Sequence, residues 1–232
     1  MTERGMIFNA EMVRAILDGR KTQTRRPIKW KQTRFTEIGE REDGSKWPWS
    51  EDAEHACDFW HPCPFGAVGD RIWVREAYRF PASLDDVSPT GVGEMAVATG
   101  YRKPWAPTFY EFTGTFSDGW KGFETPPKVS DAGKLRPSIH MPRWASRILL
   151  EITDVRVERL NAISEEDARA EGIIDGGCLN CGEPEPCGCA NPEPDATDAF
   201  AYLWQSIYGQ ENWNANPWVW VIEFKRVEGG AA

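Results

Sequence analysis

Eight consecutive residues, 19–26, set the strongest constraint on how this chain folds. They read Gly-Arg-Lys-Thr-Gln-Thr-Arg-Arg, so four cationic side chains and two hydroxyls stand together just before Pro27. Charged side chains are rarely buried without partners. The fold must therefore leave this basic segment in solvent as a turn, or build around it a site for an anionic or polar ligand.

The charge of the chain is unevenly distributed. Its formal net charge is −9, yet residues 1–34 carry nine Lys or Arg against three Asp or Glu, which is a local charge of +6. The remaining residues therefore sum to −15. A protein that binds long duplex DNA must neutralise many phosphates, which this balance disfavours. A basic face on an acidic protein favours a nucleoside, a nucleotide or a short single-stranded RNA as its partner.

Hydropathy predicts no membrane partner. No segment is long and apolar enough to cross a bilayer, and the first residues lack the pattern of a signal peptide. We therefore expect a cytoplasmic protein. Cysteines in that reducing compartment are usually thiols or metal ligands rather than disulfides.

Local patterns predict a mixed α+β fold. An apolar helical stripe follows Asn9, a good N-cap, and Gly19 is placed to end that helix. Ser164 opens a second helix that Gly172 ends, and apolar spacing predicts a third over 200–207. Scattered strands between short helices are typical of a small barrel with inserts. Strands are expected at 6–8, 71–76, 95–101, 147–160 and 218–227, a helical turn at 142–146, and loops over 28–66 and 80–94.

The basic segment resembles a known family signature. Gly19-x-Lys21-x-x-Thr24-x-Arg26 is similar to the Gly-x-Lys-x-x-Glu-x-Arg motif of ASCH domains, with Thr24 in place of the Glu. ASCH domains are PUA-like β-barrels linked to RNA and modified nucleosides. The resemblance implies a single PUA-like small β-barrel over 1–232, with short flanking helices. It places long loop inserts at about 28–66 and 80–138 and a Cys-rich loop at 174–196.

A closer resemblance links the chain to small bacterial ASCH amidohydrolases, which remove acyl groups from N4-acetylcytidine. It covers about residues 6–27, 69–76, 147–173 and 200–227. It implies catalytic roles for Lys21, Thr24 and Glu171. The chain also resembles larger phage or prophage ASCH-type proteins over 5–27, 62–76 and 137–160, which implies the host cytoplasm as its location.

The three implied catalytic residues make chemical sense together. A Thr hydroxyl is a poor nucleophile unless a neighbouring base takes its proton, and a Lys with a lowered pKa is such a base. A carboxylate such as Glu171 orients the substrate or carries a proton to the leaving amine. A helical turn would bring Lys21 and Thr24 together, whereas an extended strand would point them to opposite faces. The alternative is a solvated basic turn with a structural Thr.

Several further residues are candidates for substrate binding. The planar forks of Arg25 and Arg26 suit a phosphate or a base edge, or else pair with carboxylates of the chain. Aromatic side chains such as Trp73, Tyr78 and Trp144 suit base stacking, although a single aromatic residue more often belongs to a core. The full set that we predict to bind substrate is Gly19, Arg20, Arg25, Arg26, Trp73, Glu76 and Tyr78, with a salt bridge as the alternative role of Glu76.

Four thiols gather in one acidic, Pro-rich segment. Four thiolates suit tetrahedral Zn²⁺, and a polar loop needs such a site to be ordered. We therefore predict a structural zinc site, with free thiols in an unstructured loop as the alternative. Its ligands are Cys178, Cys181, Cys187 and Cys189. A weaker second cluster comprises His55, Cys57, His61 and Cys63, and His140 is expected to be structural.

These patterns lead to one leading function and two alternatives. We expect recognition of a nucleoside, nucleotide or RNA in a cleft built around residues 19–26, with hydrolysis of an N4-acyl group on cytidine or a similar modified base. The first alternative is a non-catalytic module that binds RNA or modified nucleic acid. The second is a ribonuclease.

Overall fold

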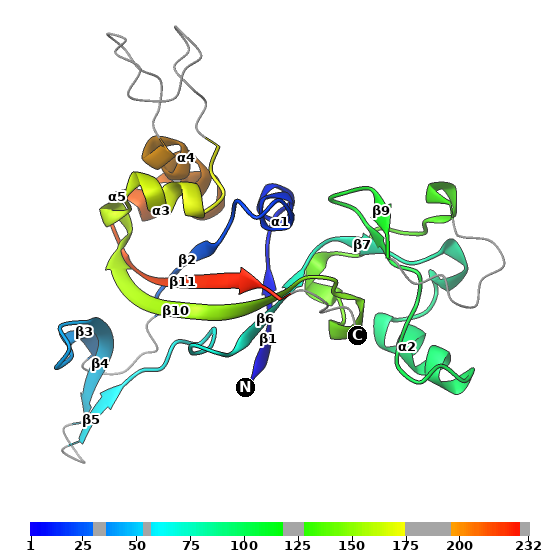
Figure 1. Ribbon diagram of the computed structural model, residues 1–232, viewed down its shortest axis with the longest axis horizontal. Coiled ribbons are helices and arrows are strands. Elements are labelled where there is room, and N and C mark those ends of the chain that lie inside the picture. The colour runs from blue at the N-terminus through cyan, green and yellow to red at the C-terminus, as the bar shows by residue number, and fades with distance from the viewer. Residues whose placement is uncertain (30–35, 53–56, 118–127, 175–195, 228–232) are drawn as a thin grey trace, which may run out of the picture. The chain divides into compact units, whose positions relative to one another are not determined.

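The fold is mixed α+β and divides into two compact units. The computed structural model describes residues 1–29, 36–52, 57–117, 128–174 and 196–227 (Figure 1). Unit 1 comprises Met1–Leu17, Arg71–Glu151 and Arg226–Ala232, and unit 2 comprises Asp18–Asp70 and Ile152–Lys225. Strand β10 (Leu149–Arg159) begins in unit 1 and continues in unit 2.

Unit 1 is built on the paired strands β1 and β6. Strand β1 pairs in parallel with β6, and β6 pairs antiparallel with the first residues of β10. A second sheet has the strand order β7-β8-β9. The elements of unit 1 are β1 (Glu3–Ile7), α1 (Ala10–Leu17), β6 (Arg71–Arg75), β7 (Tyr78–Arg79), α2 (Pro89–Ala98), β8 (Phe109–Tyr110) and β9 (Thr115–Phe116), with short 3-10 turns between them. Tyr78, Phe80 and Tyr110 are the largest members of a buried cluster in this unit.

Unit 2 carries the basic segment on an edge strand. Strand β2 pairs antiparallel with β11, and β11 lies between β2 and β10. A separate antiparallel sheet has the order β3-β4-β5. The elements of unit 2 are β2 (Gln23–Pro27), β3 (Thr36–Glu40), β4 (Lys46–Asp52), β5 (Cys57–Trp60), α3 (Glu165–Ala170), α4 (Ala196–Tyr208), α5 (Gln210–Asn214) and β11 (Trp218–Arg226).

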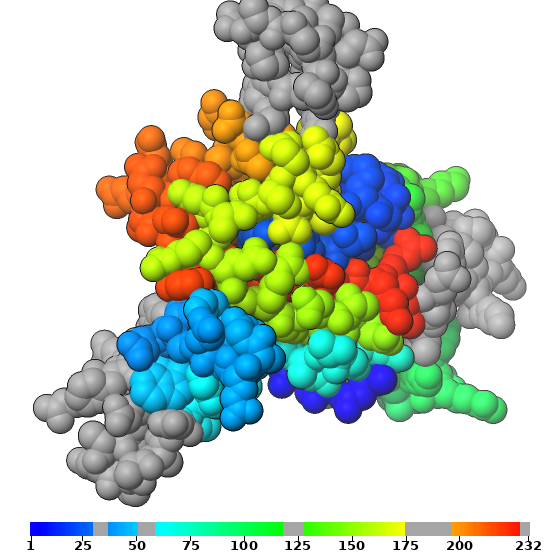
Figure 2. Space-filling view, turned by 60° about the vertical axis from the view of Figure 1, so that its left-hand side comes forward, coloured from blue at the N-terminus to red at the C-terminus, as the bar shows by residue number. Residues whose placement is uncertain are grey.

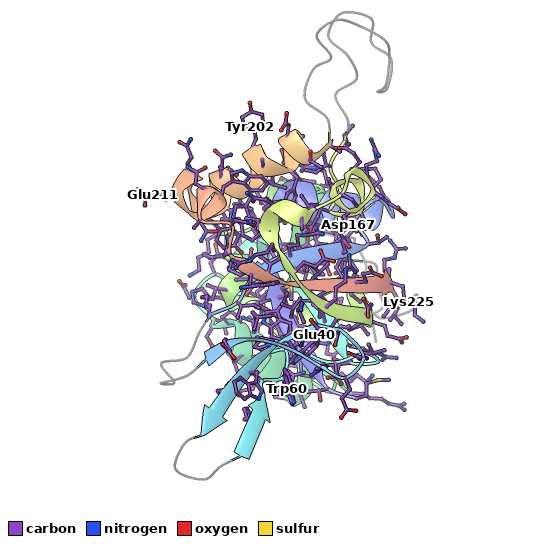
Figure 3. The ribbon with its side chains drawn as sticks, turned by 90° about the vertical axis from the view of Figure 1, so that its left-hand side faces the viewer. Glu40, Trp60, Asp167, Tyr202, Glu211 and Lys225 are labelled. Atoms are coloured by element: carbon purple, nitrogen blue, oxygen red, sulfur yellow. The ribbon has the colours of Figure 1, made fainter. Side chains whose placement is uncertain are left out.

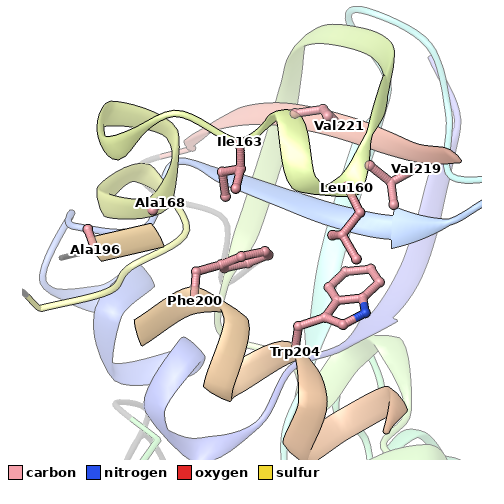
Figure 4. Close-up of a cluster of buried hydrophobic side chains, with 8 residues drawn as sticks. All are labelled: Leu160, Ile163, Ala168, Ala196, Phe200, Trp204, Val219 and Val221. Atoms are coloured by element: carbon pink, nitrogen blue, oxygen red, sulfur yellow. The ribbon is translucent and has the colours of Figure 1, made fainter. Parts of the chain in front are cut away.

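Helices α3, α4 and α5 lie on the same side of strands β2, β10 and β11 (Figure 1). Phe200 and Trp204, one turn apart on α4, are buried against Val219 and Val221 of β11 (Figure 4). Figure 2 shows the face on which the yellow-green residues of β10 and α3 reach the surface. This packing fixes the face of the sheet that α3 covers.

Most expected helices are confirmed. The side chain of Asn9 accepts a hydrogen bond from Met12 N at 2.8 Å, and Gly19 adopts φ +77° after α1. Ser164 caps α3 by accepting from Asp167 N at 3.1 Å. The turn expected at 142–146 is a 3-10 turn, and β10 and β11 occupy the two longest predicted strands. None of the described helices is long and apolar enough to cross a membrane.

Two expectations are wrong, and a third, the barrel, is not confirmed. The loop expected over 28–66 contains β3, β4 and β5, and β4 and β5 carry aromatic residues that favour a pleated sheet. The strand expected at 95–101 is instead the end of α2, which starts at Pro89 after the N-cap Ser88. Among the described residues, the strands form three separate sheets and close into no barrel. The PUA-like architecture therefore stays a prediction.

Candidate functional site

From Lys21 onward the basic segment is extended, and Lys21, Thr24 and Arg25 are buried rather than in a solvated turn. Lys21 forms an isolated antiparallel bridge with Glu171, and β2 starts at Gln23. The exposed fractions of Lys21, Thr24 and Arg25 are 2%, 1% and 2%. The fold therefore had to supply partners for these charges, because an unpaired charge in an interior is very costly.

The register of β2 and β11 separates Thr24 from its neighbours. Arg25 lies opposite Val221, and Thr24 lies opposite Ile222. Directly paired residues share a face of the sheet and successive residues alternate, so Arg25 lies on the face that α4 covers and Thr24 lies on the other. Residues 23–27 thus form an extended strand rather than a helical turn. This conformation points Thr24 away from the partners of Arg25.

Lys21 and Glu171 form a buried ion pair although 150 positions separate them in the sequence. The Lys21 Nζ donates to Glu171 Oε2 at 2.6 Å and to the Glu171 backbone carbonyl at 2.8 Å. The two side chains are 0% and 2% exposed. Burial lowers the pKa of Lys21 from its ordinary value; Glu171 opposes this effect, and the charges of Arg26 and Arg25 add to it.

Arg25 is the second buried cation on this face. Its Nη2 donates to Asp167 Oδ2 at 2.6 Å and to Glu158 Oε2 at 3.2 Å. Its Nη1 lies 3.5 Å from Glu171 Oε1, as an ion pair without hydrogen-bond geometry. Within the described part of the chain, Arg25 Nε, Arg25 Nη1 and Glu171 Oε1 are buried and have no hydrogen-bond partner.

Arg156 of β10 completes the network. Its Nε donates to Glu158 at 2.6 Å, its Nη1 donates to Glu223, and its Nη2 donates to Asp167 and Gln23. Burial raises the pKa of Asp167, but the hydrogen bond from Arg25 and the charges of Arg25 and Arg156 outweigh that effect and hold the pKa below its ordinary value. We call the whole set the ionic cluster: Lys21, Gln23, Arg25, Arg156, Glu158, Asp167, Glu171 and Glu223.

The ionic cluster has a buried floor and an acidic rim. Lys21, Arg25 and Glu171 form the floor, whereas Asp167 on α3 stands at the edge that faces β2 (Figure 3). Side-chain exposure is 23% for Asp167, 28% for Glu158 and 42% for Glu223. With three cations and four carboxylates, the ionic cluster carries a formal charge of −1, which excludes a simple anion-binding pocket.

The other predicted binding residues lie elsewhere. Gly19 shapes the turn after α1, and Arg20 at the surface pairs with Asp18 at 3.1 Å and donates to the Gly172 carbonyl. Arg26 Nη1 lies 3.5 Å from the Tyr208 hydroxyl. The structure therefore brings Lys21, Arg25 and Glu171 together, and leaves Gly19 and Arg20 outside the ionic cluster.

Trp73, Glu76 and Tyr78 belong to unit 1. The Arg75 guanidinium lies over the Trp73 ring at 4.4 Å, and the Tyr78 hydroxyl donates to the His140 carbonyl at 2.8 Å. Burial raises the pKa of Tyr78 to about 12.

Glu76 forms a salt bridge, the alternative role that the sequence predicted for it. Arg147 donates to both of its carboxylate oxygens at 2.9 Å. Burial raises the pKa of Glu76, and Arg147 opposes that shift. Trp144, the third stacking candidate, also lies in unit 1 and stacks on Phe80 with ring centroids 5.4 Å apart.

The zinc prediction falls outside the described residues, because Cys178, Cys181, Cys187 and Cys189 all lie in 175–195. Of the weaker cluster, His55 is also outside them, His61 Nε2 is 2.9 Å from Ser50 Oγ, and Cys63 is buried. No group of three His, Cys, Asp or Glu among the described residues is arranged to hold a metal.

Comparison with known proteins gave no identification. The chain matched no protein-family model, no curated protein and no solved structure. The resemblance to ASCH domains therefore stays a hypothesis, and the site has to be interpreted from its own geometry.

Sequence reasoning missed five members of the ionic cluster: Gln23, Arg156, Glu158, Asp167 and Glu223. A signal for two of them was present, since charged residues at 154, 156 and 158 alternate with Val155 and Val157 in one strand. Such alternation predicts a charged face, and a charged face beside the basic segment predicts pairing. The other three depend on how α3 lies over β2 and on the register of β2 with β11, which the local sequence does not specify.

Proposed function

We propose that unit 2 binds an uncharged nucleoside-like ligand at the ionic cluster and hydrolyses an N-acyl amide carried by that ligand. The observation that carries this proposal is the buried contact between Lys21 and Glu171. The motif resemblance implies a catalytic role for each of these residues, and they meet across 150 positions of sequence. A buried group with a perturbed pKa is typical of a functional site, and burial lowers the pKa of Lys21.

Charge is the reason for proposing an uncharged ligand. The three carboxylates at the rim would repel a phosphate, and every cation of the ionic cluster is already paired with a carboxylate. Two like charges held in contact cost several kcal/mol, which is enough to discriminate against a phosphorylated ligand. A nucleoside therefore suits the ionic cluster better than a nucleotide or an RNA backbone.

The proposed reaction uses Glu171 as a proton carrier. A water oxygen bonds to the acyl carbon while Glu171 accepts one proton from that water. The carbon–nitrogen bond then breaks, Glu171 returns the proton to the departing nitrogen, and the products are a carboxylic acid and a free amine. Lys21 holds Glu171 Oε2 and so leaves Oε1 for the reacting atoms.

Water, rather than Thr24, is the nucleophile in this scheme. A Thr nucleophile requires a base within hydrogen-bond reach of its hydroxyl, at about 2.6–3.2 Å. The register of β2 and β11 places Thr24 on the face opposite the one that carries Arg25. The catalytic role that the resemblance implies for Thr24 stays a prediction, and one substitution separates the two schemes.

The test is turnover of N4-acetylcytidine, followed by chromatography of released cytidine. Glu171→Gln keeps the size of the side chain but cannot accept the proton, so we expect turnover to fall about 100-fold or more. Thr24→Val is the matched control, since it removes only a hydroxyl and keeps the volume. Loss of turnover in Thr24→Val with an unchanged circular dichroism spectrum would establish Thr24 as the nucleophile instead.

A binding module without catalysis is the second candidate. It is favoured by the burial of Lys21, whose side chain is fully enclosed. Measurable affinity for the acetylated nucleoside, with no release of cytidine by the wild-type protein, would select this candidate. No observation in the described residues favours the ribonuclease alternative, and incubation with RNA tests it directly.

A further inference from the structure

Helix α2 of unit 1 (Figure 1) forms one wall of a cavity that the proposed function does not use. The cavity has a volume of about 520 Å³, within the range of roughly 300–1,000 Å³ that small-molecule sites occupy. The wall is a stripe of α2 at helical spacing: Thr90, Gly93, Glu94 and Val97. Every residue that lines the cavity belongs to unit 1, so the cavity lies within one compact unit.

Helix α2 is unusually apolar for a helix that is not fully covered. Of its ten residues, only Thr90 and Glu94 have polar side chains. A helix that is apolar on nearly all sides is normally buried on all sides, yet Met95 and Val97 are 48% and 47% exposed. Both polar residues line the cavity. The little polarity that α2 has is therefore directed to the place where a ligand would lie.

The remaining walls are apolar and held in place. They are formed chiefly by Pro104, Pro142 and Trp144. Phe80 stacks on the Trp144 ring with the two planes only 6° apart, which fixes the indole. Glycine weakens a helix interior, but a Cβ at Gly93 would lie 2.9 Å from Pro104 Cβ and 3.0 Å from Trp144 Nε1, so only glycine lets α2 come this close. Walls that are formed in advance lower the entropic cost of binding.

Glu94 decides the charge of the ligand. It is the only charged residue in the lining, and among the described residues its carboxylate has no hydrogen bond or ion pair. Arg102 and Lys103, on the segment that leads from α2 to the next wall, are exposed and do not line the cavity. An apolar cavity with one unpaired carboxylate at its wall is complementary to a cation on an apolar body.

We propose that this cavity binds a small organic ammonium ion whose body is apolar or aromatic. The ammonium N–H groups donate to the Glu94 carboxylate, and the Thr90 hydroxyl, one turn earlier in the same wall, is a second acceptor. The body packs against Trp144 and the two prolines, and its burial supplies most of the affinity. An anion would meet Glu94 as a like charge. This inference is independent of the proposed function, because the ionic cluster belongs to unit 2.

The test titrates the full chain with three compounds that share a phenyl group and differ in charge: 2-phenylethylamine as its ammonium ion, 2-phenylethanol and phenylacetate. The Trp144 indole N–H, assigned from its loss in Trp144→Phe, reports binding in ¹H–¹⁵N spectra. We expect the ammonium to shift this resonance saturably, the alcohol to bind about threefold to fivefold more weakly for want of a partly exposed ion pair, and phenylacetate to give no saturable shift. No saturable shift with the ammonium, or affinity no higher than that of the alcohol or phenylacetate, would overturn the inference.

Two matched substitutions assign the charge preference to Glu94. Glu94→Gln and Asp86→Asn each remove one exposed carboxylate of unit 1, but only Glu94 lines the cavity. We expect Glu94→Gln to weaken binding of the ammonium about threefold to fivefold and to leave binding of the alcohol unchanged, and Asp86→Asn to change neither. Equal losses in the two variants would mean that the overall charge of unit 1, and not the cavity, attracts the ammonium, and would overturn the inference.

Discussion

Replacing both members of the buried Lys21–Glu171 pair should cost less stability than replacing Lys21 alone. Lys21→Met leaves the Glu171 carboxylate enclosed, with only the imperfect contact to Arg25 Nη1 at 3.5 Å. Leaving one charge of a buried pair uncompensated costs about 3–5 kcal/mol. Adding Glu171→Met substitutes an apolar pair of similar volume, and such replacements are often neutral or stabilising.

The assay is urea unfolding at pH 7, followed by far-ultraviolet circular dichroism. A loss of about 3–5 kcal/mol corresponds to roughly 6–20 °C in melting temperature for a chain of this size, so thermal unfolding provides a second readout. We expect the double variant to be more stable than Lys21→Met and to lack turnover. A double variant whose loss equals the sum of the two single losses would show that the pair is not coupled and would refute the reasoning.

The pH dependence of stability tests the same pair. Because burial lowers the pKa of Lys21 below its ordinary 10.5, the unfolded chain binds more protons than the folded protein between the two pKa values. Stability from this group should therefore rise as pH increases through that window. The double variant lacks the group, so its stability should rise less over the same range.

Four further outcomes are expected. The lowered pKa of Asp167 means that its stabilisation is lost as pH falls through the folded-state value, so Asp167→Asn should flatten the acid side of the stability profile below about pH 4. The logarithm of ligand affinity should fall with the logarithm of salt concentration with a slope below about 0.7, the contribution of one phosphate on a single strand. A slope that corresponds to about four or more phosphates would contradict an uncharged ligand. Arg147→Ala should destabilise the protein by about 3–5 kcal/mol in urea unfolding by leaving Glu76 buried and unpaired, whereas Arg143→Ala, which removes a surface pair with Glu3, should cost less than about 1 kcal/mol. Elemental analysis should find about one zinc per chain, and Cys178→Ser should abolish it.

Short-range signals in the sequence predicted the elements that depend on a few neighbouring residues. The cap at Asn9, the left-handed Gly19 and the cap at Ser164 are all determined within one turn of helix. Strands β3–β5 were missed because Pro48 and Pro62 suggest loops. Pro48 lies within β4, where the segment's aromatic residues outweigh its poor strand propensity.

The basic segment shows why its environment was not predictable from local sequence. Eight residues specify its charge but not its partners, and those partners lie 133–150 positions away on β10 and α3. Burial followed from those pairings, because only enclosed carboxylates make an enclosed Lys21 and Arg25 tolerable. The resemblance identified Glu171 by its position in a motif, and the geometry adds what that motif could not, namely the buried pairing of Glu171 with Lys21.

The continuity of β10 governs how this protein can be dissected. Each unit is assembled from separate stretches of chain, and β10 passes from one to the other without a linker. No single truncation isolates the ionic cluster, because a fragment that ends after the basic segment lacks α3 and β11, and a fragment that starts at β10 lacks β2. Expression of unit 2 by itself requires removal of three stretches, 1–17, 71–151 and 226–232, and an engineered junction between residues 70 and 152. Limited proteolysis should therefore cut the chain into fragments that stay associated. It should not release unit 2 as an autonomous domain.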